Sequence, residues 1–146
     1  MSRRQPSLRL AVVGALGHRD LPSRATLRRW VALALDADAQ LCLAFVDTRT
    51  GRRLNREFRA RDYATNVLTF VYQRRPAVAD IVLSMPVVRR EAREQAKTLR
   101  AHLAHLIVHG VLHAQGYDHE GQRDAKRMHS RECRILARLR IADPYR

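Results

Sequence analysis

The order of strand-like and helix-like segments limits the fold of this chain more than any other feature of its sequence. Short apolar, β-branched runs come early, at 8–13, 41–46, 67–72 and 78–83. Helical periodicity interrupts them after Pro22 and around 52–58, and it continues from Pro86 to the C-terminus. Strands that alternate with helices, followed by helices alone, predict a small mixed sheet with helices packed on it. This is either an α+β fold or a compact α/β one.

Three helices are expected after Pro86. The first runs to about Leu99, the second covers about 101–115, and the last carries its apolar residues on one side, at Met128, Ile135, Leu136 and Leu139. The chain of 146 residues has no internal repeat, low-complexity segment or linker, so we expect a single domain over 1–146. A chain of this length buries roughly two thirds of the surface that it exposes when unfolded and needs no disulfide scaffold.

Composition excludes two classes of protein. With 46% hydrophobic and 29% charged residues, the chain is too apolar to be disordered and too charged to be a membrane protein. The apolar stretch at 8–16 is short and interrupted by Arg9, so it does not form a signal peptide. Cys42 and Cys133 fit no metal-binding spacing, and we expect two buried free thiols in a reducing compartment. We therefore expect a cytoplasmic protein with no membrane association.

The balance of charge is strongly basic. Against 14 acidic residues stand 28 basic ones, which gives a formal net charge of +14, and only Lys97 and Lys126 among the basic residues are lysines. Such a chain is expected to attract polyanions, either nucleic acid or an anionic membrane surface. Aromatic residues make up only 5% of the sequence, so backbone electrostatics and shape should dominate the binding of a nucleic acid over stacking on its bases.

Five of the seven histidines lie between His102 and His119. On a helix, His109 and His113 are one turn apart on the same face, so both imidazoles can reach one ion. A third ligand must come from beyond a reversal of the chain. Gly116 permits that reversal, because glycine adopts the left-handed conformation that ends a helix. His119 follows three residues later, and the spacing predicts a three-histidine zinc site with an open fourth position at the end of a central helix.

The same intervals form the skeleton of the metzincin zinc motif, with one difference. Gly110 stands directly after the first histidine, where a metalloprotease carries its general-base glutamate, so peptide hydrolysis by that route is not expected. Glycine inside a helix costs about 1 kcal/mol relative to alanine, and we expect either the sheet or a substrate to approach the backbone at Gly110. We expect His102 and His105 to be hydrogen-bonded or surface residues rather than ligands. Asp118 is either an acceptor for a ligand imidazole or a turn residue.

The segment 109–119 closely resembles the signature of the YbeY family of bacterial endoribonucleases. Further segments are similar to motifs of that family, namely LNREFR at 54–59, ATNVLTF at 64–70, ADIVLS at 79–84 and PVV at 86–88. The likeness extends over roughly 52–139. The sequence departs from the family pattern at Asn66, Thr69 and Ala79, where the family usually has aspartate, serine and glycine.

The resemblance implies a zinc-dependent, single-strand-specific endoribonuclease that acts in 16S rRNA 3′-end maturation and ribosome quality control. Single-stranded RNA or rRNA and the ribosome or its small subunit would be its partners. By position, His109, His113 and His119 match the ligands of one Zn²⁺ per chain, and Arg59 matches an arginine near the site. The implied fold is α+β, a mixed four-stranded sheet packed with about five helices.

Three functions remain open from the residues themselves. The first is a zinc-dependent RNA hydrolase, in which zinc lowers the pKa of bound water toward ~7 or polarises a phosphoryl oxygen while the planar fork of Arg59 holds the phosphate. The second is a ribosome-assembly or RNA-binding factor with a mainly structural zinc and little or no cleavage. The third is a metal hydrolase that acts on something other than RNA. No residue is an obvious general base, and the nucleophile is either metal-bound water or the 2′-hydroxyl of the RNA.

Overall fold

A computed structural model of the protein describes residues 5–59, 65–118 and 120–145, apart from the side chain of Arg59. Within these ranges lie four strands: β1 (Leu8–Val13), β2 (Ala39–Val46), β3 (Val67–Arg74) and β4 (Ala77–Ser84). The α-helices are α1 (Arg24–Leu33), α2 (Thr48–Arg59), α3 (Met85–Glu94), α4 (Leu99–Ala114) and α5 (Gln122–Arg138). The expected α+β fold with four strands and five helices is confirmed.

The sheet is mixed, with the strand order β1-β2-β4-β3. β1, β2 and β4 are parallel neighbours, and β3 is antiparallel to β4. Parallel strands need a crossover connection, which α1 provides between β1 and β2 and which α2 with β3 provides between β2 and β4. The early strands alternate with helices because each parallel pair of strands needs a crossover connection.

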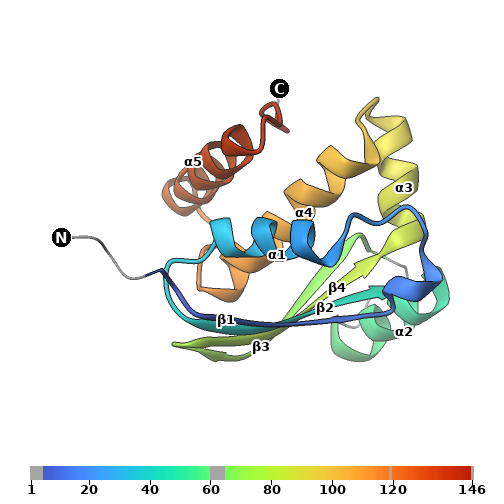
Figure 1. The fold of residues 1–146 in the computed structure, drawn as a ribbon, viewed down its shortest axis with the longest axis horizontal. Coiled ribbons are helices and arrows are strands. Elements are labelled where there is room, and N and C mark those ends of the chain that lie inside the picture. The colour runs from blue at the N-terminus through green and yellow to red at the C-terminus, as the bar shows by residue number, and fades with distance from the viewer. Residues whose placement is uncertain (1–4, 60–64, 119, 146) are drawn as a thin grey trace.

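The two faces of the sheet are covered unequally (Figure 1). Ala79, Ile81 and Leu83 of β4 are fully buried on the face that α4 covers. On the opposite face, Val82 lines a groove with Leu54 and Phe58 of α2. Figure 1 shows α1, α4 and α5 on one side of the sheet, with α4 running behind α1 across the strands. The hydrophobic core therefore lies between the sheet and the helices around α4.

The helix predicted to begin after Pro86 ends earlier than expected. It was predicted to reach about Leu99, but α3 ends at Glu94. Ala96 adopts a left-handed φ of 53°, and the Lys97 amide donates to the Ala92 carbonyl at 2.9 Å, which closes the helix. Thr98 then caps α4, because its hydroxyl accepts the Ala101 amide at 3.0 Å. The two predicted helices are both present, but the break between them comes earlier than predicted, at 95–98.

The central helix α4 is buried almost all round. Ten of its sixteen residues are buried, among them the polar His102. It ends where the sequence predicts. Gly116 has a φ of 102°, and the amides of Gly116 and Tyr117 donate to the carbonyls of His113 and Leu112 at 3.0 and 3.1 Å. None of the described helices is both long enough and apolar enough to cross a membrane.

Gly110 lies where α4 crosses the sheet. A Cβ at this position would lie 2.9 Å from Cγ2 of Ile81 and 3.4 Å from Oγ1 of Thr69. Of the two expected neighbours, the sheet and not a substrate therefore approaches the backbone here. A glutamate after the first histidine would have no room on this face of α4.

The contact at Gly110 predicts that Gly110→Ala destabilises the protein. Overpacking against Ile81 should cost about 1–3 kcal/mol, which outweighs the gain of about 1 kcal/mol in helix propensity. Urea denaturation measures the free energy of unfolding. Gly17→Ala is the matched control, because no atom lies within 4 Å of a Cβ built at that position. Equal stabilities for the two variants would contradict the proposed close packing.

Candidate metal centre

His109 and His113 project from the same face of α4, as their spacing predicts. Their rings are nearly parallel, with an interplanar angle of 7° and ring centroids 6.4 Å apart. His109 is 27% exposed at its side chain, and His113 is likewise half-buried. The pair is therefore fixed by a rigid helix and still accessible from outside.

A hydrogen bond to one ring nitrogen of each histidine determines which nitrogen can bind a metal. Nδ1 of His113 lies 3.1 Å from the Tyr117 carbonyl oxygen. A carbonyl only accepts, so Nδ1 must carry the hydrogen and Nε2 the lone pair. Nδ1 of His109 lies 2.8 Å from Oε1 of Glu132 and is held in the same way. Both imidazoles are thus set in the tautomer that offers Nε2, which is how proteins commonly orient metal-binding histidines.

Glu132 of α5 is the acceptor for two histidines. Its side chain is 1% exposed, and its second oxygen lies 2.9 Å from Nε2 of His105 and accepts the Tyr145 hydroxyl at 2.7 Å. Burial pushes the pKa of Glu132 upward, but the hydrogen bonds from His105, His109 and Tyr145 outweigh burial and lower the pKa to about 2. Burial, together with the hydrogen bond to Glu132, raises the pKa of Tyr145. Glu132 is therefore a fixed negative charge behind His109.

Sequence reasoning missed Glu132, although a signal for it was present. Glu132 stands on the apolar stripe of α5, four residues after Met128 and three before Ile135, and all three residues are buried. A charged residue on a buried stripe needs a partner, and the histidines of α4 are that partner. Tyr145 had no comparable signal, because it lies outside any helix or strand.

Two groups of side chains among the described residues could hold a metal ion. One is His105, His109 and Glu132, and the other is His129, Cys133 and Asp143, with the donor atoms of each group within 4.8 Å of one another. The first group shares His109 with the predicted zinc site. Its distances of 2.8 and 2.9 Å are those of charge-assisted hydrogen bonds. Cys42 and Cys133 form no disulfide, as expected, but both are half-buried rather than buried.

Two of the predicted site residues are not described. His119 lies outside the described residues, and Arg59 is the last residue of α2, with its side chain outside the description. The turn that leads to His119 is described as far as Asp118, whose Oδ1 accepts the Glu120 amide at 3.1 Å. This bond gives Asp118 the turn role, one of its two expected roles.

His102 is a buried, hydrogen-bonded histidine, as expected. Its Nε2 lies 2.9 Å from Oε1 of Glu91, on α3. Asn66, which replaces the aspartate usual in the family pattern, donates its amide to the same oxygen at 3.0 Å and accepts the Val67 amide at 2.6 Å. An asparagine satisfies a carboxylate on one side and a backbone N–H on the other, which an aspartate cannot do.

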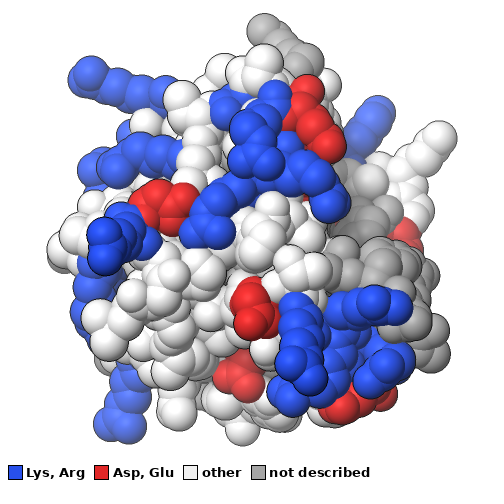
Figure 2. All heavy atoms as spheres, turned by 90° about the vertical axis from the view of Figure 1, so that its right-hand side faces the viewer, with Lys and Arg blue, Asp and Glu red and all other residues white. Residues whose placement is uncertain are grey.

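Basic side chains gather on the face that carries α2 and α3. Figure 2 shows two separate areas of Lys and Arg there. α2 itself carries four exposed arginines, Arg49, Arg52, Arg53 and Arg56. The resulting positive potential lies on the helix that ends at Arg59.

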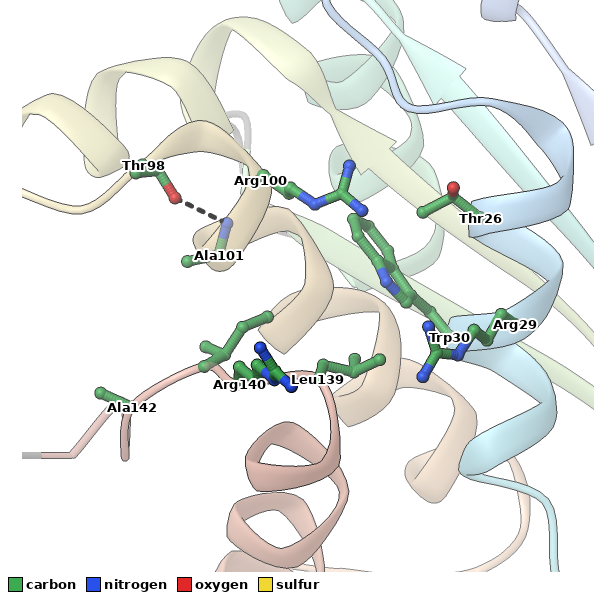
Figure 3. Close-up of a pocket in the computed structure, with 10 residues that line it drawn as sticks. Thr26, Arg29, Trp30, Thr98, Arg100, Ala101, Leu139, Arg140 and Ala142 are labelled. Atoms are coloured by element: carbon green, nitrogen blue, oxygen red, sulfur yellow. Dashed lines mark hydrogen bonds between the residues drawn. The ribbon is translucent and has the colours of Figure 1, made fainter.

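A further basic site lies between α1, the start of α4 and the segment 139–142. It is a pocket of about 360 Å³ whose charged lining residues are all arginines: Arg29, Arg100 and Arg140. The Arg100 guanidinium lies beside the ring of Trp30 (Figure 3), and the distance to the ring centroid is 5.4 Å. Because Trp30 is only 2% exposed, this pocket offers charge rather than a stacking surface.

The contact of Glu132 with His109 predicts that Glu132→Gln weakens metal binding. Glutamine keeps the volume but removes the charge and can accept from only one imidazole N–H, so we expect metal affinity to fall about 10–100-fold. Competition against a chromophoric chelator measures this affinity. Glu94→Gln is the control, because Glu94 is exposed on α3 and pairs only loosely with Arg90 at 3.8 Å. Unchanged affinity in Glu132→Gln would mean that the carboxylate does not act on the metal.

The contact of Asn66 with Glu91 predicts the effect of Asn66→Asp. The variant loses a donor and sets two carboxylates side by side, so we expect a loss of about 1–3 kcal/mol near neutral pH. The loss should shrink as the pH falls, because repulsion raises the pKa of one carboxyl and its protonation restores a donor. Thermal unfolding at neutral and at acidic pH checks this. A variant as stable as the wild type at neutral pH would contradict it.

Comparison with known proteins agrees with the fold and with the sequence pattern. A family model described as Endoribonuclease YbeY matches residues 22–140. Endoribonuclease YbeY of Thiobacillus denitrificans is 54% identical over 143 residues, which covers 96% of this chain and 97% of that protein. Endoribonuclease YbeY of Polaromonas sp. is 55% identical over 134 residues, 90% of this chain and 87% of that protein. The solution structure of TM1509 from Thermotoga maritima has a similar fold, with a TM-score of 0.58 at 24% identity over 95% of this chain and 99% of that one. The chain belongs to the endoribonuclease YbeY family.

Proposed function

We propose that this protein is a zinc-dependent, single-strand-specific endoribonuclease that acts in 16S rRNA 3′-end maturation and ribosome quality control. The observation that carries the proposal is the pair His109 and His113, one helical turn apart, with the Nδ1 atom of each ring hydrogen-bonded so that Nε2 is the nitrogen with the lone pair. The names of the close relatives support the nuclease activity.

The proposed zinc site consists of His109, His113 and His119, with one ion per chain. The two histidines of α4 fit zinc, because imidazole nitrogen is one of its usual ligands and three protein ligands leave a position open for chemistry. A bound zinc ion would supply Lewis-acid polarisation of a phosphoryl oxygen or an activated water. In this arrangement Glu132 is not a ligand. It orients His109 and compensates part of the positive charge of the site.

The protein's own residues provide the binding and positioning that cleavage requires. Arg59, at the end of α2, holds the phosphate next to the scissile bond through its two parallel N–H groups. The exposed arginines of α2 extend this positive surface, so that an RNA strand bound along the helix reaches Arg59.

The binding surface favours RNA backbone over RNA sequence. Trp30 is buried, and among the residues that the structure describes the exposed large aromatic side chains are Phe58, Tyr72 and Tyr145. Charge neutralisation by arginine is independent of base identity. We therefore propose that the ribosome or its small subunit, and not base readout, selects the cleavage site, and that the protein works as a single domain over 1–146 in the cytoplasm.

A cleavage assay on single-stranded RNA tests the proposal. We expect the purified protein to cut the RNA, chelation to abolish cleavage and zinc to restore it. His113→Ala and Arg59→Glu should each reduce the rate about 100-fold or more, because each removes a group that stabilises charge in the transition state. Arg138→Glu is the control, since it reverses the charge of an exposed arginine at the far end of α5.

The possible outcomes separate the candidate functions. If the wild type and all variants leave the same trace activity, a contaminating nuclease explains it and the enzyme proposal fails. A wild type that binds RNA tightly without cutting it would favour the assembly factor with a structural zinc. A protein that neither binds nor cuts RNA would favour a metal hydrolase with a different substrate.

A further inference from the structure

A second group of metal-binding side chains comes from α5 and the segment that follows it, and it shares no residue with His109 and His113. His129 and Cys133 are four residues apart on α5, so both lie on one face of the helix. Asp143 comes from the segment that follows α5. Its Oδ1 lies 3.6 Å from Nε2 of His129, and its carboxylate accepts a hydrogen bond from the Cys133 thiol. One nitrogen, one sulfur and one oxygen donor thus lie within 4.8 Å of one another.

The C-terminal segment is held in place by contacts that do not involve these donors alone. The Lys97 ammonium donates to the Pro144 carbonyl at 3.1 Å, and the Tyr145 hydroxyl donates to Glu132 at 2.7 Å. The Tyr145 amide donates to Oδ1 of Asp143 at 2.8 Å, and the Tyr145 ring packs against His129 with centroids 3.7 Å apart. The position of Asp143 beside α5 is therefore set in advance by its neighbours.

The donor set and its spacing suit a transition-metal ion. In a tetrahedral zinc site with bonds of about 2.0–2.3 Å, neighbouring donor atoms lie about 3.3–3.6 Å apart. The nitrogen-to-oxygen distance of 3.6 Å is already close to this value. Thiolate and imidazole select zinc, cobalt, nickel or copper over magnesium and calcium. His129 and Asp143 are 42% and 32% exposed at their side chains, so an ion can enter from solvent.

We propose that His129, Cys133 and Asp143 form a second metal-binding site that takes a divalent transition-metal ion such as Zn²⁺ and fastens the C-terminal segment to α5. On binding, the Cys133 thiol releases its proton to solvent and the sulfur forms the bond to the metal. The site leaves a fourth position for water. It is separate from the proposed catalytic zinc, because none of its three ligands is shared with that site.

Metal binding at this site also acts on the neighbourhood of His109. Asp143 and Tyr145 belong to one short segment, and Tyr145 donates to the carboxylate that holds His109. An ion bound to Asp143 therefore fixes Tyr145 against Glu132. A metal ion in the second site would thus stabilise the orientation of His109 on α4 through Tyr145 and Glu132.

Cobalt is the probe that distinguishes the two sites. A Co²⁺–thiolate bond gives an intense charge-transfer absorption in the near ultraviolet, and a site made only of histidine, carboxylate and water does not. The wild-type protein titrated with Co²⁺ should therefore show this absorption. Cys133→Ser should abolish it, and His129→Ala should abolish it at the Co²⁺ concentration that saturates the wild type. Cys42→Ser is the matched control and should keep it, because Cys42 lies on β2.

The outcomes decide the proposal without reference to nuclease activity. Absence of the charge-transfer absorption in the wild type, or its persistence in Cys133→Ser, would overturn it. A band lost in Cys42→Ser would also overturn it, because the sulfur would then belong to the wrong cysteine. Circular dichroism shows that each variant is folded. As an independent measurement, Zn²⁺ should slow the alkylation of Cys133 by iodoacetamide at least about tenfold without slowing that of Cys42, whereas equal rates with and without Zn²⁺ contradict the site.

Discussion

The burial of α4 is the constraint on which the rest of the structure depends. This helix packs against the sheet at Gly110 and also contacts α1, α3 and α5. A polar side chain on such a helix must find a partner, because burying it without one costs several kcal/mol. His102 pairs with Glu91 of α3, whereas His105 and His109 share Glu132 of α5. The histidines of α4 thus account for the positions of Glu91 on α3 and Glu132 on α5.

This pairing changes the meaning of the strong positive charge. Most of the basic residues are exposed, while two acidic residues that matter for the site, Glu91 and Glu132, lie at the histidines inside. The arginines on the surface can therefore attract a polyanion, while the carboxylates of Glu91 and Glu132 remain next to the histidines of α4. Burial raises the pKa of Glu132, but the three donors that converge on its carboxylate outweigh burial and keep the pKa low.

Much of the fold follows from the sequence because its signals are local. β1 has the predicted bounds, and Gly116 ends α4 as its position suggests. The end of α3 was missed, because the left-handed residue that closes it is an alanine and not a glycine. The spacing of His109 and His113 was sufficient to place them on one face. The partners Glu132 and Tyr145 were not predicted, because they lie 23 and 36 residues beyond His109 in the sequence. Glu132 meets His109, and Tyr145 meets Glu132, only through tertiary packing.

The position of Glu132 also bears on the order in which the protein is completed during synthesis. The ribosome delivers the chain from its N-terminus, so the sheet and α4 can be in place before α5 emerges. His109 then exists without the carboxylate that sets its tautomer, and Tyr145 arrives last of all. The ring of His109 is oriented only when α5 docks, whereas Nδ1 of His113 already donates to the Tyr117 carbonyl. The orientation of His109 is therefore complete only after α5 has docked, and nascent chains that stop before α5 contain His109 without the carboxylate that sets its tautomer.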